Sequence, residues 1–186
     1  MPRPFAASCP RPLSARALLA LLVTLSALLG VVTPDAREAE AAGTQFVKRF
    51  GAASQTAITN EVLMDETGAI YAAGTFAGTV NFGGGALTSA GDTDIWVLKL
   101  DPRGNHVWSR RFGGASQEQV TSLVIRDGVL RLGGGFGATV DFGTGPQTNA
   151  GSTDGYVVSL NASNGSTTGA ARLGGTGFDI VGGLAV

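Results

Sequence analysis

Asp92-Thr-Asp94 places two carboxylates close together, and carboxylates are among the oxygen ligands that Ca²⁺ takes in proteins. Sixty residues later the sequence reads Ser152-Thr-Asp154, so that only the second carboxylate returns. Asp92, Asp94 and Asp154 are therefore candidate Ca²⁺ ligands. Because Ca²⁺ needs about six to eight oxygens, an Asx-type turn at the entrance to a strand explains these residues more simply. We favour the turn and predict no established metal site.

Glu118 and Asp179 are carboxylates that take the same place in successive copies of an internal repeat, where the first copy has Thr56. Two carboxylates on neighbouring units could flank a sugar substrate, as glycoside hydrolysis requires. The repetition alone also explains their relation. No nucleophile–base pair accompanies them, so we expect no catalytic residue and a protein that is not an enzyme.

His106 is the only histidine in the chain, which excludes a histidine metal cluster and a histidine-based catalytic triad. Because His106 lies just before an expected strand, we predict that it is a solvated turn residue. Three aromatic residues, Trp96, Trp108 and Tyr156, could offer stacking platforms to a sugar. At apolar strand positions such side chains usually belong to the core. We favour the core for Trp96 and Tyr156 and leave Trp108 open.

The glycine-rich stretch Gly133-Gly-Gly-Phe-Gly-Ala138 fits the spacing of a dinucleotide-binding loop. That loop requires a helix to begin directly after it, because the pyrophosphate sits on the helix N-terminus. Thr139-Val-Asp-Phe142 gives no indication of a helix, and the equivalent first-copy residues 73–78 contain fewer glycines. The stretch therefore indicates a strand interior or bulge, and we expect no cofactor.

These residues are positioned by a repeat with a period of about sixty residues. Gly68 to Gly83 returns as Gly128 to Gly143, and Thr88 to Leu100 returns as Thr148 to Leu160. Self-similarity at a fixed long period indicates an array of supersecondary units, each of which needs its neighbours to bury a face.

Each unit divides into four short strands separated by turn residues. The expected strands are 58–63, 70–76, 95–100 and 106–112 in the first copy, and 120–125, 129–136, 155–160 and 170–173 in the second. Asp127-Gly128 predicts a two-residue hairpin turn. The apolar run Ile95–Leu100 predicts a strand covered on both faces, whereas the alternating Val107–Phe112 predicts an outer strand. The predicted fold class is all-β, with tandem four-stranded antiparallel blades of a β-propeller.

The ordered series of motifs resembles the bacterial β-propeller repeat known as the SBBP repeat. The matching segments are 108–114, 127–128, Phe136, 140–143, 150–154 and 156–160. The resemblance covers about Phe46 to Val186 and implies a tandem-repeat protein of the bacterial cell exterior. The second copy departs from the first at Arg131, where the first has Tyr71, and at Thr168-Gly-Ala-Ala, which replaces the aromatic-basic fourth strand. No shared ligand site follows from the resemblance.

The first forty-one residues have the features of a secretory signal peptide rather than of a folded domain. Arg3, Arg11 and Arg16 precede an apolar run from Ala17 to Val32, and Ala39-Glu-Ala41 fits a cleavage site. The run is shorter than the roughly 20 residues of a membrane span, which disfavours an uncleaved anchor. We predict a signal-peptide helix within 1–41 and export to the periplasm, the cell surface or the medium.

Cysteine and charge exclude further classes of function. Cys9 is the only cysteine, so cleavage of the signal peptide would leave no disulfide and no thiolate site. From Ala42 onward nine Lys/Arg and eleven Asp/Glu are scattered without a basic patch. We therefore expect no nucleic-acid partner, and we expect membrane contact only through the signal sequence.

The domain boundaries follow from aligning the copies. We expect a signal peptide at 1–41, an N-terminal strand in 42–56, one blade at 57–117, a second at 118–178 and the first strand of a third at 179–186. Phe46–Gly51 aligns with the fourth strand Trp108–Gly113, so it could close a ring in a longer protein. A propeller needs about 4 to 8 blades, so we favour a truncated reading of a longer chain over association of copies.

The expected function is a non-catalytic scaffold whose loops contact a protein or a glycan. Further blades or self-association would have to cover the open faces of the two-blade piece. The alternatives are part of a propeller enzyme that acts on glycans, and a truncated fragment without function.

Overall fold

A computed structural model of the chain describes Lys48, Phe50 and residues 56–185. These residues form an all-β structure with antiparallel sheets and no helix, which confirms the predicted fold class at that level. The predicted signal peptide at 1–41 and nearly all of the expected N-terminal strand in 42–56 lie outside the described residues. Among the residues described, no helix has the length and hydropathy needed to span a membrane.

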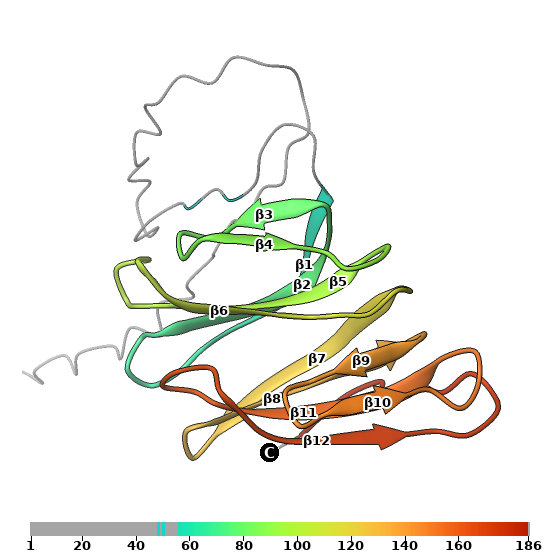
Figure 1. The fold of residues 1–186 in the computed structure, drawn as a ribbon. Coiled ribbons are helices and arrows are strands. Elements are labelled where there is room, and N and C mark those ends of the chain that lie inside the picture. The colour runs from blue at the N-terminus through green and yellow to red at the C-terminus, as the bar shows by residue number, and fades with distance from the viewer. Residues whose placement is uncertain (1–47, 49, 51–55, 186) are drawn as a thin grey trace, which may run out of the picture.

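Two four-stranded sheets make up most of the structure (Figure 1). The first sheet contains β1 (Thr56–Met64), β2 (Ile70–Ala77), β5 (Asp94–Leu100) and β6 (His106–Phe112). The second contains β7 (Glu118–Arg126), β8 (Val129–Phe136), β11 (Asp154–Asn161) and β12 (Thr167–Leu173). In both, the strands pair in chain order, so β5 is an inner strand and β6 an outer one, as predicted.

Each sheet also carries a short hairpin between its second and third long strands, which the sequence did not predict. The hairpins are β3–β4 (Thr79–Asn81 and Ala86–Thr88) and β9–β10 (Thr139–Asp141 and Pro146–Thr148). Both place a buried phenylalanine, Phe82 or Phe142, over one face of their sheet. The predicted Asp127-Gly128 turn is confirmed, since it joins β7 to β8 with φ angles of 51° and 73°.

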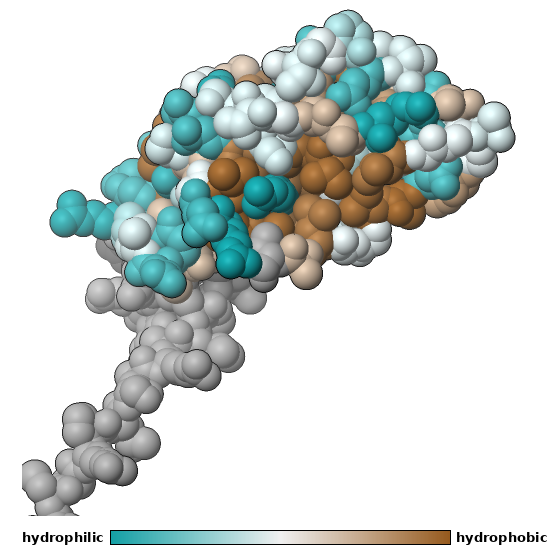
Figure 2. All heavy atoms as spheres, turned by 90° about the horizontal axis from the view of Figure 1, so that it is seen from below, coloured by the Kyte–Doolittle hydropathy of each residue, from teal (hydrophilic) through white to brown (hydrophobic). Residues whose placement is uncertain are grey.

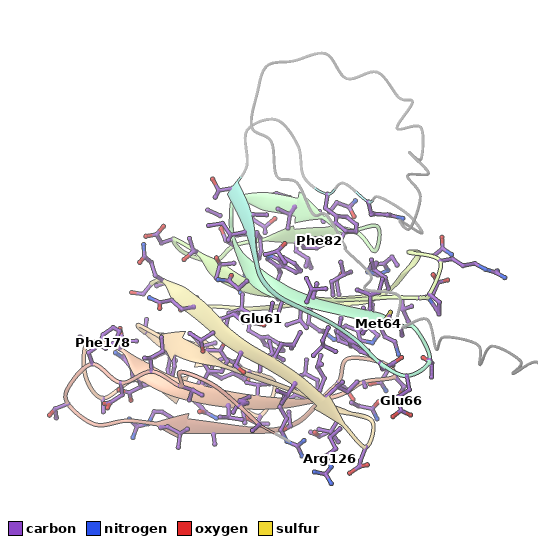
Figure 3. All side chains as sticks on the ribbon, turned by 180° about the vertical axis from the view of Figure 1, so that it is seen from behind. Glu61, Met64, Glu66, Phe82, Arg126 and Phe178 are labelled. Carbon is purple, nitrogen blue, oxygen red and sulfur yellow. The ribbon has the colours of Figure 1, made fainter. Side chains whose placement is uncertain are left out.

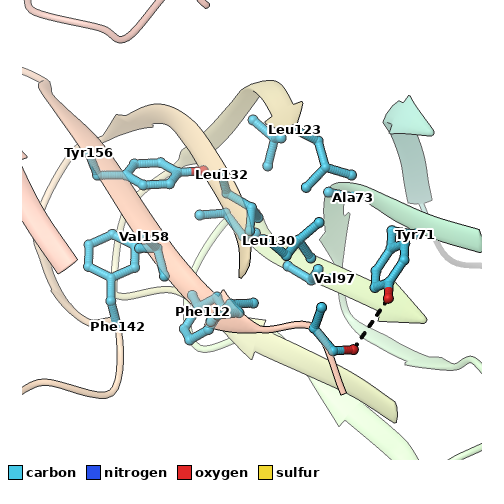
Figure 4. Close-up of a cluster of buried hydrophobic side chains, with 14 of the residues drawn as sticks. Tyr71, Ala73, Val97, Phe112, Leu123, Leu130, Leu132, Phe142, Tyr156 and Val158 are labelled. Atoms are coloured by element: carbon cyan, nitrogen blue, oxygen red, sulfur yellow. Dashed lines mark hydrogen bonds between the residues drawn. The ribbon is translucent and has the colours of Figure 1, made fainter. Parts of the chain in front are cut away.

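The main hydrophobic core lies between the two sheets (Figure 4). Both sheets contribute aliphatic and aromatic side chains. The first-sheet residues are Tyr71, Ala73, Ile95, Val97, Trp108 and Phe112. The second-sheet residues are Leu130, Leu132, Tyr156, Val158 and Leu160, with Phe142 from the hairpin. Strand β7 contacts β1, β2 and β5, so the first strand of the second sheet packs against the first sheet.

A second cluster covers the opposite face of the first sheet. It contains Ile70, Ala72, Trp96, Leu98 and Leu100, together with Phe82 from the hairpin. The ring centroids of Phe82 and Trp96 are 4.7 Å apart. Figure 3 shows Phe82 between the β3–β4 hairpin and the first sheet, on the side away from the second sheet. The two sheets are therefore stacked with unlike faces in contact, and among the described residues no four-stranded sheet covers this face of the first sheet.

The C-terminal segment 178–185 lies across the outer face of the second sheet. The Asp179 N–H donates to Thr153 O at 2.8 Å, and the Val181 N–H donates to Gly134 O at 3.1 Å. Figure 2 views the molecule from below and shows apolar side chains gathered on this side. We expected the first strand of a third unit at 179–186. In the structure residues 179–185 are not in a regular strand, and an isolated bridge joins Thr153 to Phe178 just before them.

Candidate functional site

The junction between the two sheets contains a cluster of charged side chains, which we call the first joint: the buried carboxylates Asp94 and Glu118 and the partly exposed Arg111. Asp94 is the first residue of β5, and its side chain is 0% exposed. Its Oδ2 accepts the Ala90 N–H at 2.9 Å and pairs with Arg111 Nε at 3.2 Å. Arg111 reaches the carboxylate from the neighbouring strand β6. The pair therefore links the inner strand β5 to the outer strand β6 at one end of the first sheet.

Glu118 joins the second sheet to this pair. It is the first residue of β7 and is 1% exposed. Its N–H donates to Thr93 O at 2.9 Å, and its Oε2 accepts the Gly114 N–H at 3.1 Å. Burial raises the pKa of Glu118 to about 7; the Asp94 charge adds to this rise, while the Gly114 N–H and Arg111 oppose it. Within the described residues, neither Glu118 Oε1 nor Asp94 Oδ1 has a hydrogen-bond partner.

A glycine is required at position 113, directly after the end of β6. A Cβ at Gly113 would lie 2.2 Å from Asp94 Cγ, closer than any real contact. The carboxylate therefore packs directly against the backbone, and Arg111 also donates to Gly113 O at 3.2 Å.

The same arrangement recurs in the second sheet as the second joint: Asp154, Arg172 and Asp179. Asp154 Oδ2 accepts the Ala150 N–H at 2.9 Å and pairs with Arg172. Asp179 Oδ2 accepts the Gly175 N–H at 2.9 Å. Each contact has its counterpart 60 or 61 residues earlier in the chain. The second joint is more open, since Asp179 is only half-buried, whereas Glu118 is buried.

The structure uses the candidate Ca²⁺ ligands for other contacts. Asp92 is exposed and accepts a hydrogen bond from Gln117 Nε2 at 2.7 Å. Asp94 and Asp154 lie in different sheets and each pairs with an arginine, which already supplies the cationic partner. In residues 56–185 no three side chains of His, Cys, Asp or Glu are grouped as a metal would need.

The predicted Asx-type turn takes a different form in the structure. An Asx side chain ordinarily accepts a backbone N–H two residues further on. Asp94 and Asp154 instead accept the N–H four residues before them, so each carboxylate closes the loop that leads into its strand. Sequence reasoning missed the arginine partners because Thr168-Gly-Ala-Ala conceals the correspondence of Arg172 with Arg111. The spacing of 61 residues between the two arginines was the sequence feature that could have revealed their correspondence.

Glu118 and Asp179 do not form a pair of facing carboxylates. Each belongs to its own joint and accepts a different backbone N–H. The expectation that Thr56 is the residue equivalent to Glu118 in the first copy is also wrong. Strand register pairs Glu118 with Phe136 and Ala57 with Phe76, so Ala57 is the equivalent residue.

His106 is not a solvated turn residue. It is the first residue of β6 and is half-buried, with its ring against Gly84. Its Nε2 lies 3.1 Å from Ser109 Oγ. Burial, and secondarily the charge of Lys48, lower its pKa. The side chain therefore acts as a packing residue beside the β3–β4 hairpin.

The three aromatic candidates are all buried, which confirms the core interpretation for Trp96 and Tyr156. Trp96 Nε1 donates to Ile58 O at 3.2 Å, and the Tyr156 hydroxyl donates to Gln119 O at 3.0 Å. The Trp108 ring packs against Gly165 in the β11–β12 turn, so it presents no open platform to a sugar. The stretch 133–138 lies mostly within β8 and opens no helix.

The carbonyl of Ala162, in the β11–β12 turn, is the acceptor that fastens this turn to the first sheet. It accepts hydrogen bonds from Trp108 Nε1 at 3.2 Å, Lys99 Nζ at 2.9 Å and the Tyr71 hydroxyl at 3.4 Å. Figure 4 marks the bond from Tyr71. The Lys99 ammonium also lies 5.0 Å from the centroid of the Tyr71 ring. These contacts bind the sheets together at the end opposite to the first joint.

Trp108→Phe should lower the free energy of unfolding by about 1–2 kcal/mol, because it removes one buried hydrogen bond and part of the ring that covers Gly165. Tyr71→Phe is the comparison: it keeps the ring and removes only a hydroxyl, which lies 3.4 Å from Ala162 O and 3.2 Å from Asp65 Oδ2, so its loss should be smaller. Urea unfolding of both variants measures the difference. Equal losses would contradict a special role for the Trp108 bond.

The chain matches no protein-family model and no curated protein. Its function is therefore inferred from the arrangement of its own residues.

Proposed function

We propose that this chain is a segment of an exported β-propeller, of the kind that the SBBP-like repeat indicates, and that it serves as a non-catalytic structural and binding scaffold. The observation that carries the proposal is the repetition of the joint. Asp94, Arg111 and Glu118 make the contacts that Asp154, Arg172 and Asp179 make again. Side chains that hold successive units together in the same way are structural parts of an array.

The stacking of unlike faces supports the same proposal. The face of the first sheet that bears Ala73 and Val97 packs on the face of the second that bears Leu132 and Val158. Contacts between unlike faces can be repeated from unit to unit, and they generate a ring when the rotation closes. A β-propeller is such a ring of four-stranded sheets, with about 4 to 8 blades.

Phe50 supports the presence of another blade on the open face of the first sheet. Its ring lies 5.4 Å from that of Phe82, just as the ring of Phe112 lies 5.9 Å from that of Phe142. Phe50 therefore packs against the first sheet in the way that Phe112, in the outer strand β6, packs against the second. We propose that the segment around Phe50 is the fourth strand of a further blade. Its other strands would come from the same polypeptide or from a second copy.

A scaffold of this kind would meet its partners through the loops between strands, since these carry the exposed polar side chains of the structure. A protein or a glycan is the proposed class of partner, and the periplasm, the cell surface or the medium is the proposed location. The buried carboxylates are poorly suited to glycan hydrolysis, which needs two carboxyl groups that face one accessible cleft.

Binding without turnover is the expected result when the purified protein is incubated with a panel of extracellular polysaccharides and exported proteins. Retention is measured by co-sedimentation, and cleavage by the appearance of new reducing ends. Glu118→Gln and Asp179→Asn variants should retain the same ligands as the unmodified protein. Cleavage that both substitutions abolish would overturn the scaffold proposal in favour of a glycan-acting enzyme.

A further inference from the structure

At the first joint a single guanidinium serves two buried carboxylates among the described residues. Arg111 pairs with Asp94 and contributes to the field at Glu118, and each carboxylate keeps one oxygen without a partner. A buried negative charge without its own cation or full set of hydrogen bonds is costly. A carboxyl group in this position lowers that cost by taking up a proton.

The groups that face Glu118 come from every element around it. Asp94 on β5 repels a second negative charge, Arg111 on β6 attracts it, and the Gly114 N–H donates to Oε2. The Tyr156 hydroxyl on β11 is neutral, because burial and the Glu118 charge both raise its pKa. Its proton is already donated to Gln119 O. No second cation is therefore supplied to Glu118 by the described residues that face it.

We propose that Glu118 is a proton-operated clamp between the two sheets. When its carboxyl is protonated, the start of β7 lies tightly against Thr93 and Gly114 at the end of the first sheet. When it ionises, repulsion from Asp94 and the cost of holding an ionised carboxylate away from water loosen this end of the interface. The contacts of Ala162 at the other end persist. The junction is then a hinge whose stiffness follows the pH outside the cell.

The direction of the pH effect follows from where the proton is held more tightly. The pKa of Glu118 is about 7 in the folded protein, compared with an ordinary value of 4.5. The folded state therefore binds more protons between these values, and stability falls as the pH rises from 4.5 to 7. Above this window both states are ionised and the loss is complete. His106 changes the stability with pH in the opposite direction, because its pKa is lowered in the folded protein. A variant of Glu118 is therefore needed to isolate the effect of the clamp.

The test compares the unmodified protein with Glu118→Gln, which keeps the shape of the side chain and cannot ionise. At pH 5 the two should have similar unfolding constants, whereas at pH 8 the unmodified protein should unfold more readily, on the order of a hundredfold. Asp179→Asn, at the equivalent and more exposed position of the second joint, should leave the pH dependence unchanged. Equal pH dependence of the unmodified protein and Glu118→Gln would overturn the proposal.

Two measurements on the unmodified protein keep the proposal falsifiable even if the glutamine variant folds poorly. The Glu118 side-chain carboxyl carbon should titrate near pH 7 by NMR, and a midpoint below about 5 would overturn the proposal. Amide exchange at Gly114 and Glu118, corrected for the intrinsic rate, should become less protected between pH 5.5 and 8. Protection at the N–H groups of β2 should not change, since a clamp loosens locally. Constant protection at Gly114 would also overturn it.

Discussion

Gly134→Ala should destabilise the protein by more than about 3 kcal/mol, which is a large part of the stability of an ordinary domain. A Cβ at this position would lie 1.9 Å from Gln119 O and 2.9 Å from Tyr156 Cε1. Neither can retreat easily. Gln119 is held in β7 beside a bulge, and its carbonyl accepts the Tyr156 hydroxyl at 3.0 Å. The methyl group would have to separate β7 from β8 or expel the ring.

The first sheet repeats this arrangement and gives an independent test of it. A Cβ at Gly74 would lie 1.8 Å from Ile58 O, which accepts the Trp96 Nε1–H across the strand. Gly74→Ala should therefore cost as much as Gly134→Ala. Gly169→Ala is the control, since a Cβ there meets no atom within 4 Å. Thermal and urea unfolding measure all three. Losses below about 1 kcal/mol in both inner-strand variants would contradict the packing described.

Arg111→Met should cost about 3 kcal/mol, because it leaves the fully buried Asp94 without its cation. Methionine keeps much of the length of the side chain, so most of the loss reports the missing charge. Asp94 would keep the Ala90 N–H as a partner, while Glu118 stays beside it. The arginine is 30% exposed, which places the expected loss at the lower end of the range for buried pairs.

Two further variants separate the charge effect from general damage to a strand. Arg126→Met is the control, because its pair with Asp127 is exposed and should contribute about 0–1 kcal/mol. Figure 3 shows Arg126 at the β7–β8 turn, away from the core. Asp94→Asn in the Arg111→Met background should recover part of the loss, since it removes the uncompensated charge. Urea unfolding provides the values. A loss no greater than that of Arg126→Met would show that the ion pair is dispensable.

The strands were largely predictable because their signals are local. The alternation in Val107–Phe112 indicated an outer strand, and the apolar run Ile95–Leu100 indicated an inner one. Asp127-Gly128 predicted its turn because few residue pairs accept two positive φ angles. The small hairpins were missed, since strands of three residues carry too little pattern to be distinguished from loops.

The candidate site was less predictable, because it depends on residues that are distant in the sequence. Asp94 and Glu118 were both noticed from the sequence, but as a turn residue and as half of a carboxylate pair. Nothing local connects them with Arg111, which reaches Asp94 only because β5 and β6 are neighbours. The β1–β2 turn is one residue longer than the β7–β8 turn, since Met64 pairs with Ile70 whereas Ile125 pairs with Leu130. Ala57 rather than Thr56 therefore corresponds to Glu118.

By itself the sequence determined the all-β class, the repeating four-stranded plan and the position of most long strands. These follow from side-chain period and turn chemistry, which act over a few residues. Only the tertiary structure decided that Trp108 donates a hydrogen bond to the Ala162 carbonyl in the β11–β12 turn, and that Asp94 forms an ion pair with Arg111. The physical reason is that burial and ion pairing depend on which faces meet. That choice is made by packing between strands far apart in the chain.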